Sequence, residues 1–152
     1  MKKAFFIFFG ILFMLPSYAE CPENIDKYLI GHSLAVVEGQ NVKFYEGRGI
    51  KPLVNYLDKN DFKGACVADK AIGKASALLL VYGGAKNVYT PLISRGAVEV
   101  FEAHNVNFKA QKTVDNILNR RGDDLCPMEK AVLDIDNPKK AYKTLKKAVK
   151  NL

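Results

Sequence analysis

The stretch that most constrains the fold is GACVADKAIGKASALLLVYGG, residues 64–84. The apolar run Gly64–Val67 has the length and composition of a buried strand. A segment from Lys70 to about Tyr82 follows, is apolar on most faces and ends at two glycines, which predicts a largely buried helix. A buried strand followed directly by a buried helix is typical of a crossover unit in an α/β sheet.

The rest of the chain repeats this alternation of short strands and helices. Residues 33–37 and 42–45 are rich in β-forming residues and flank a turn-forming segment, so they predict a hairpin. Further strands are expected at residues 87–89 and 106–110, and further helices near Pro52, Ser94, Cys126 and Asn137. The pattern predicts an α/β three-layer sandwich with a mixed sheet, whose first two strands are antiparallel and whose other strands follow crossover helices.

The amino-terminal residues have the pattern of a secretory signal peptide. Two lysines precede an apolar run from Ala4 to Leu15, and small residues occupy the positions that a signal peptidase recognises. A membrane anchor would need about 20 apolar residues, and this run is broken at Pro16. We therefore expect a signal peptide at residues 1–19 and one domain at residues 20–152, located in the periplasm or outside the cell.

Three cysteines follow the expected leader, namely Cys21, Cys66 and Cys126. In an oxidising compartment they allow at most one disulfide within the chain, together with a free thiol or an intermolecular bond. The sequence does not choose among the three pairings. Because His32 and His104 are the only histidines and no C-x-x-C motif is present, we expect no metal and no cofactor.

Lys70 and Lys74 are four residues apart at the expected start of the buried helix. A helix amino terminus has unpaired N–H groups and partial positive charge, so two lysines there predict an anionic partner. That partner is either a small anionic ligand or a carboxylate of the chain itself, such as Asp69. Glycine inside a helix costs about 1 kcal/mol relative to alanine, so Gly73 indicates close approach of a backbone or a ligand.

The segment CPME, residues 126–129, predicts the start of another helix, with Glu129 as a capping-box glutamate. The helix dipole at Cys126 favours a nucleophilic thiolate, whereas a disulfide or an inert buried thiol is the alternative. The preceding loop supplies Asn119 and Arg120 as candidate ligand-binding residues, because arginine suits bidentate contacts with carboxylates and phosphates.

The last segment, NPKKAYKTLKKAVKNL, predicts a basic helix that belongs to the domain. It places an apolar stripe on one face and six lysines around the rest. Such a helix either packs its stripe on the domain and solvates its lysines, or it binds a membrane surface or nucleic acid. The packed arrangement is the commoner one and is expected here, with membrane contact only through the signal peptide. Because interleaved aromatics and arginines are lacking, we expect no nucleic acid as partner.

Two motifs resemble a known bacterial family. ADKAIGKA starts at Ala68, and I-x-N-R-x-G-D-x-x-C-P-x-E spans Ile117 to Glu129. Together they are similar to the domain of unknown function family 1893, and the resemblance extends from about Leu34 to Val132. The known fold of that family is similar to the fold of cytidine deaminase, so the resemblance implies a deaminase-like domain.

Zinc deaminases place His-Ala-Glu where a strand meets a helix and Pro-Cys-x-x-Cys at the start of the next helix. By chain order, residues 67–69 take the first place and residues 91–95 the second, and neither segment supplies the zinc ligands. The resemblance therefore implies a zinc-free domain in which Asp69 is left for acid–base chemistry, with Lys70 beside it. Ser94, in the second segment, is a further candidate contact.

Three functions are compatible with these residues. The first is a deaminase-like domain without zinc that binds a small anionic or nucleotide-like ligand. The second is a non-catalytic periplasmic binding or interaction protein, and the third is a thiol-dependent activity centred on Cys126. The sequence leaves open whether the chain is an enzyme and what its oligomeric state is. The candidate catalytic residues are Asp69 and Cys126, and the candidate ligand-binding residues are Lys70, Gly73, Lys74, Ser94, Asn119, Arg120 and Glu129.

Overall fold

The structure is a computed structural model that describes residues 20–151. The expected signal peptide at residues 1–19 lies outside the described residues. Within the described part, no helix has the length and apolar character needed to cross a membrane.

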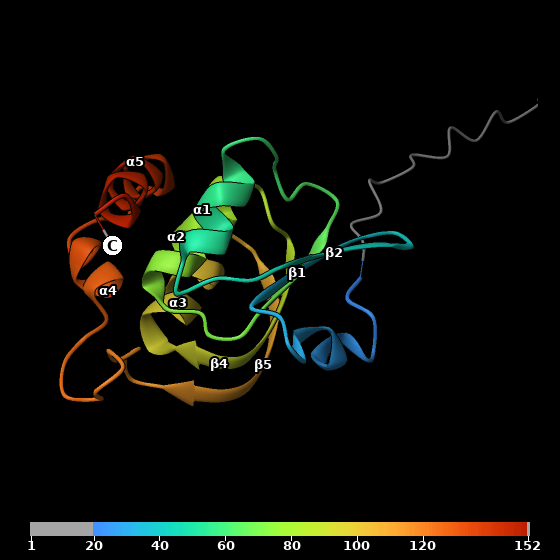
Figure 1. Ribbon diagram of the computed structural model, residues 1–152, viewed down its shortest axis with the longest axis horizontal. Coiled ribbons are helices and arrows are strands. Elements are labelled where there is room, and N and C mark those ends of the chain that lie inside the picture. Colours follow the sequence, from blue (N-terminus) through green and yellow to red (C-terminus); the bar gives the residue numbers. More distant parts are fainter. Residues whose placement is uncertain (1–19, 152) are drawn as a thin grey trace, which may run out of the picture.

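The described chain forms a five-stranded mixed sheet in the order β2-β1-β3-β4-β5 (Figure 1). Strand β1 is antiparallel to β2 and to β3, whereas β3, β4 and β5 are parallel. The predicted hairpin, the α/β class and the mixed sheet are therefore confirmed. The strands are β1 (Leu34–Glu38), β2 (Asn41–Tyr45), β3 (Cys66–Asp69), β4 (Asn87–Ser94) and β5 (Asn107–Val114).

The helices are the 3-10 helix η1 (Ile25–Leu29) and the α-helices α1 (Lys51–Leu57), α2 (Lys74–Tyr82), α3 (Arg95–Ala103), α4 (Pro127–Ala131) and α5 (Pro138–Val149). Side chains along β1 alternate between the two sheet faces. Leu34 and Val36 belong to the core formed with α1, α2, α3 and α5, whereas Ala35 and Val37 pack with η1. The other face of the described sheet is thus covered by η1 alone (Figure 1).

The α-helices therefore lie on one face of the sheet and do not flank it on both faces, as a three-layer α/β/α sandwich requires. The crossovers through α2 and α3 advance in the same direction across the sheet. Crossovers of the same handedness then place both helices on the same face. Helix α2 is buried from Ala75 to Leu80, because it lies between the sheet and α5.

Helix α2 begins later than the sequence predicts. It starts at Lys74, and Gly73 is its N-cap residue in an extended conformation. Ile72 instead forms a parallel bridge with Ile93 and is held by backbone hydrogen bonds of 2.8 and 2.9 Å. Because β4 is longer than predicted and reaches Ile72, these bonds override helix formation there. The prediction that the helix begins at Lys70 and includes both lysines is therefore wrong.

A disulfide joins Cys21 to Cys66 and leaves Cys126 as a free thiol. Cys66 is buried in the central strand β3, on the sheet face where Ile25 and Leu29 of η1 pack. The bond therefore holds the segment before η1 against the sheet. This pairing is one of the three that the sequence left open.

Replacing both Cys21 and Cys66 by alanine should lower the free energy of unfolding by about 2–4 kcal/mol, because the bond joins residues 45 positions apart. Urea unfolding of the wild type and the double variant under non-reducing conditions measures the difference. Wild type treated with dithiothreitol is the control and should approach the stability of the variant. Equal stability of all three samples would contradict the assigned role.

Candidate functional site

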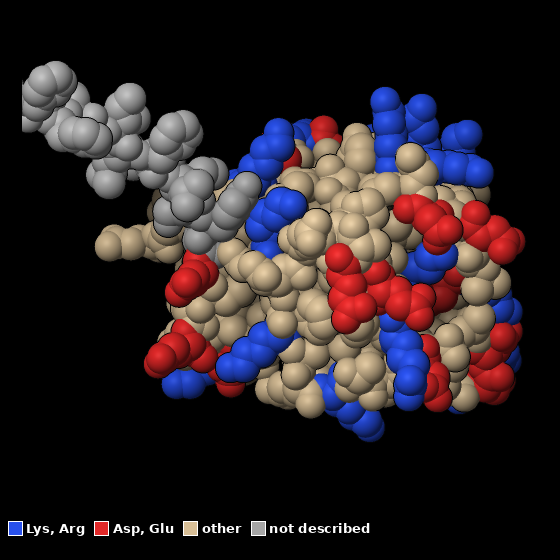
Figure 2. Space-filling model, turned by 180° about the vertical axis from the view of Figure 1, so that it is seen from behind, with Lys and Arg blue, Asp and Glu red and all other residues tan. Residues whose placement is uncertain are grey.

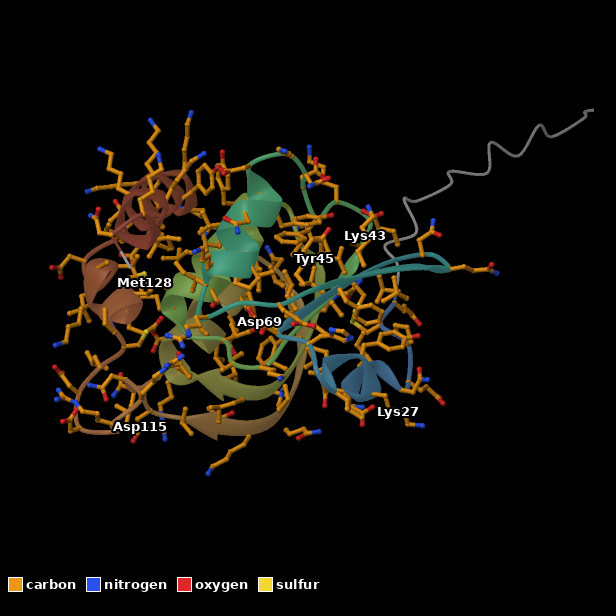
Figure 3. The ribbon with its side chains drawn as sticks, in the orientation of Figure 1. Lys27, Lys43, Tyr45, Asp69, Asp115 and Met128 are labelled. Atoms are coloured by element: carbon orange, nitrogen blue, oxygen red, sulfur yellow. A yellow bond between two sulfur atoms is a disulfide. The ribbon has the colours of Figure 1, made fainter. Side chains whose placement is uncertain are left out.

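A cavity of about 220 Å³ opens at the carboxyl end of β3. Its wall combines the segment after β3, the start of α2, the loop between β2 and α1, and the segment that leads into α4. Figure 3 labels Asp69 and Met128, which belong to this wall and come from β3 and α4. The lining residues are Ser33, Gly47, Gly49, Ile50, Asp69, Lys70, Ala71, Gly73, Ser76, Ile117, Cys126, Met128 and Glu129.

A turn between Ile117 and Cys126 brings the later part of the chain back to this cavity. The backbone N–H of Cys126 donates to the Ile117 carbonyl at 3.0 Å. Asn119 stabilises the turn, because its side-chain oxygen accepts from the Gly122 N–H at 2.8 Å. The turn places Cys126 at the cavity that Asp69 lines, although the two residues are far apart in the sequence.

Glu129 caps α2 rather than its own helix. Its carboxylate oxygens accept hydrogen bonds from the backbone N–H groups of Lys74 at 2.9 Å and Ala75 at 3.0 Å. Helix α4 has no side-chain cap, so the expected capping-box role of Glu129 is wrong. The anionic partner of the α2 amino terminus is thus a carboxylate of the chain itself, the second of the two alternatives that the sequence left open.

Gly73 allows this contact. A Cβ at Gly73 would lie 2.4 Å from a carboxylate oxygen of Glu129, so any larger residue would displace that carboxylate. Burial raises the pKa of Glu129 above its usual value, and the hydrogen bonds from Ala75 and Lys74 oppose the rise. The close approach at Gly73 is therefore made by the side chain of Glu129, and not by the backbone or ligand that the sequence predicted.

Lys74 does not line the cavity. Its ammonium donates to the Leu133 carbonyl at 2.9 Å and forms an ion pair with Asp136 at 2.9 Å. Lys70 is exposed and does line the cavity, and no ion pair within the described chain involves it. One of the two expected lysines is thus used by the fold, and the other remains available at the cavity.

Asp69 is the last residue of β3 and is only 9% exposed. Burial raises the pKa of Asp69 from its usual value of 3.8 to about 7, although backbone hydrogen bonds from Ala71 and Lys70 oppose the shift. The bond from the Ala71 N–H is long, at 3.3 Å, and no ion pair within residues 20–151 involves Asp69. A carboxyl group that titrates near neutral pH in a cavity can donate and accept a proton.

Cys126 is half-buried, and its free thiol lies on the wall of the same cavity. It is the N-cap residue of α4, which has only five residues. The disulfide alternative for this residue is therefore wrong, because Cys21 and Cys66 pair with each other.

Three of the candidate ligand-binding residues lie outside the cavity wall. Ser94 is buried, and its hydroxyl caps α3 by accepting from the Ala97 N–H at 3.1 Å. Asn119 uses its side chain to hold the turn described above. Arg120 is exposed. The structure thus gives the Ser94 and Asn119 side chains structural hydrogen bonds and places none of these three residues on the cavity wall.

The sequence did not predict the part of the wall formed by Ser33, Gly47 and Gly49. The Ser33 hydroxyl donates to the Gly47 carbonyl at 3.0 Å, which joins the entry of β1 to the loop after β2. The glycines did mark a break in the β pattern, and Gly49 has a positive φ of 53°. That signal identifies a loop but does not indicate which other loops it meets.

Fold and cavity together define an α/β domain with a small site around a buried carboxyl group. A family model described as TM1506, domain of unknown function (DUF1893), matches residues 27–149, and the chain belongs to this family. The crystal structure of a DUF1893 family protein (TM1506) from Thermotoga maritima is similar, with 23% sequence identity and a TM-score of 0.75. The match covers 84% of this chain and 92% of that chain, and it shows the fold alone. No curated protein matches.

Replacing Gly73 by alanine should lower the free energy of unfolding by about 2–3 kcal/mol, because the new methyl group displaces the Glu129 carboxylate from two hydrogen bonds. Gly96→Ala is the matched control. A Cβ there would make an ordinary contact at 3.6 Å in the first turn of α3, so this change should be neutral or stabilising. Chemical denaturation of both variants measures the difference, and equal stabilities would contradict the role of Gly73.

Asp69 should make stability depend on pH. Because its folded pKa is about 7 and its usual value is 3.8, the folded state binds the proton more tightly. The stabilisation is fully present below about pH 4 and is lost as the pH rises to about 7, a change of about 4 kcal/mol. Asp69→Asn removes this titration, so the variant should gain stability relative to wild type as the pH rises. Urea unfolding from pH 4 to 8 tests this, and parallel curves would contradict it.

Proposed function

We propose that the cavity at the end of β3 binds a small polar ligand and that Asp69 exchanges a proton with it. The observation that carries the proposal is a buried carboxyl group on a cavity wall with no cation paired to it among the described residues. Groups whose pKa values are strongly shifted by burial are concentrated at functional sites. The free Cys126 thiol on the same wall adds a second reactive group.

The size and charge of the cavity restrict the ligand. At about 220 Å³ the cavity is smaller than the roughly 300–1,000 Å³ typical of pockets for drug-sized molecules, so it accepts a fragment the size of a ring or a short chain. The α2 amino terminus already holds Glu129, which leaves Lys70 as the cation on the described wall. An anionic or nucleotide-like ligand would therefore direct its charged group towards Lys70.

We also propose that the fold of this domain is related to the fold of cytidine deaminase. The support is the resemblance of the two motifs, together with the position of the segments that follow β3 and end β4, which the bridge between Ile72 and Ile93 brings side by side. The residues at these junctions do not fit a zinc ion. Residues 67–69 and 91–95 contain neither histidine nor cysteine, and no group of three metal-ligating side chains occurs within residues 20–151. The proposed chemistry therefore uses Asp69 without a metal.

A thiol-dependent activity is the second candidate function. It is favoured by one observation, namely that Cys126 is the free cysteine and lies on the same cavity wall as Asp69. In this function the Cys126 thiolate is the nucleophile, and Asp69 is the group that accepts the thiol proton and later returns it. A third possibility, binding without catalysis, uses the same cavity and differs only in that the ligand is released unchanged.

The proposed location is the periplasm or the outside of the cell. The Cys21–Cys66 disulfide supports it, because stable disulfides are rare in the reducing cytosol. Amino-terminal sequencing of protein recovered from the periplasmic or extracellular fraction should give Glu20 or a close neighbour. Uncleaved protein confined to the cytoplasm would contradict this location.

Thermal unfolding in the presence of nucleobases, nucleotides, sugar phosphates and small amides tests the binding site. A ligand present at 100 times its Kd should stabilise the wild type by about 2.7 kcal/mol. Asp69→Asn should abolish this stabilisation. Arg120→Ala removes an exposed side chain outside the cavity wall and should retain it. Equal stabilisation of both variants would contradict the proposed site.

Product analysis then separates the candidate functions. If Cys126 is the nucleophile, Cys126→Ser should retain ligand-induced stabilisation and lose conversion of the ligand. If Asp69 acts without the thiol, Cys126→Ser should retain both. An unchanged ligand after prolonged incubation with wild type would leave binding as the function.

A further inference from the structure

The formal positive charge of helix α5 and the residue after it exceeds the net charge of the whole domain. Without the two lysines of residues 1–19, the formal net charge of the chain is +5 instead of +7. Residues 138–150 contain six lysines and no acidic residue, which leaves a net charge of −1 for the remainder. The net positive charge of residues 20–152 is therefore carried by residues 138–150.

Four of these lysines form a continuous exposed surface, which we call the basic face. At about 100° per residue they fall within an arc of about 100° along roughly 12 Å of the helix. The buried residues of α5 point to the domain core instead. Basic side chains project at the upper right of Figure 2, where α5 lies when the view of Figure 1 is turned. The basic face consists of Lys139, Lys140, Lys143 and Lys147, all exposed.

The lysines of the basic face have no partner of opposite charge within the described chain. Lys146, beside them, is paired with Asp58, and Lys150 also acts on Asp58 by lowering its pKa. Lys43, Lys63 and Lys130 elsewhere each pair with a carboxylate. Other exposed lysines also lack such a pair in the described chain, but they lie on separate elements, for example Lys27 on η1, Lys51 on α1 and Lys109 on β5. The four lysines of the basic face are instead neighbours on one helix surface.

The arrangement is unfavourable for the isolated domain. Lys139 and Lys140 lie in the first turn of α5, where the helix dipole already places positive charge. Lys143 is four residues from both Lys139 and Lys147, and like charges at this spacing repel each other. An external anionic surface would relieve both effects.

We propose that the basic face binds the anionic headgroups of a phospholipid membrane. Helix α5 cannot insert its apolar stripe, because Ala141, Leu145 and Val149 are buried in the core with α1 and α2. The contact is therefore electrostatic, with the domain lying on the headgroups. This proposal departs from the expectation from sequence, in which membrane contact was limited to the signal peptide.

The composition of the basic face favours lipid over nucleic acid. Lysine is a compact point charge that suits a diffuse layer of phosphates, whereas arginine provides the bidentate contacts typical of nucleic-acid recognition. Residues 138–150 contain no arginine. Each lysine close to an anionic leaflet strengthens binding by about fivefold, so four lysines give measurable attachment at low salt.

Co-sedimentation of residues 20–152 with vesicles tests the proposal. The protein should bind vesicles that contain phosphatidylglycerol, should not bind vesicles of phosphatidylcholine alone, and should be released at high salt. The triple variant Lys139→Gln, Lys143→Gln, Lys147→Gln should bind about 100-fold more weakly. Its thermal unfolding should show that it remains folded.

A matched control distinguishes the basic face from net charge. Lys27→Gln, Lys109→Gln and Lys112→Gln together remove the same charge from exposed positions on η1 and β5. This control should bind phosphatidylglycerol vesicles within about threefold of wild type. Equal weakening of the two triple variants, absence of binding by wild type, or tighter binding to a short DNA duplex than to the vesicles would each overturn the proposal.

Discussion

The hydrogen bonds between the Glu129 carboxylate and the amino terminus of α2 are the constraint on which the rest of the site depends. Helix α2 is buried between the sheet and α5, so its first N–H groups need partners within the protein. Glu129 supplies them from a segment 54–55 residues away in sequence. The same contact fixes α4 beside α2, requires glycine at position 73, and brings Cys126 to the cavity wall.

Two carboxyl groups line this cavity, and the fold treats them differently. Burial raises the pKa of Glu129, but two backbone hydrogen bonds and the Lys74 charge oppose that effect, so the charged form has defined partners. The hydrogen bonds to Asp69 are weaker, and the one from the Ala71 N–H is 3.3 Å long. The amino terminus of α2 therefore has its anionic partner within the chain, whereas the Asp69 carboxyl group at the end of β3 has no partner of opposite charge in the described chain.

The sequence predicted the elements better than their junctions. The hairpin, the central strand and the body of α2 follow from local periodicity and turn residues, which act over a few positions. The start of α2 was misplaced because Ile72 bonds to β4, a neighbour in space that periodicity does not indicate. Glu129 was assigned to its own helix for the same reason, since a capping box and a distant cap have identical local sequences. The helix start near Ser94 was predicted correctly because its cap, the hydrogen bond from the Ala97 N–H to the Ser94 hydroxyl, is local.

The features on which the two proposals depend are charges that folding leaves uncompensated. A neutral residue such as asparagine at position 69 would avoid a penalty of about 4 kcal/mol at neutral pH, a large share of the roughly 5–15 kcal/mol by which domains are stable. Glutamate in place of Lys143 would likewise replace repulsion along α5 by attraction to Lys139 and Lys147. Since the same fold compensates Glu129, Lys74 and Lys146, it has the means to satisfy such groups. The buried Asp69 carboxyl group and the exposed lysines of the basic face thus remain without partners of opposite charge in the described chain, and the two proposals assign such partners to a ligand and to a membrane.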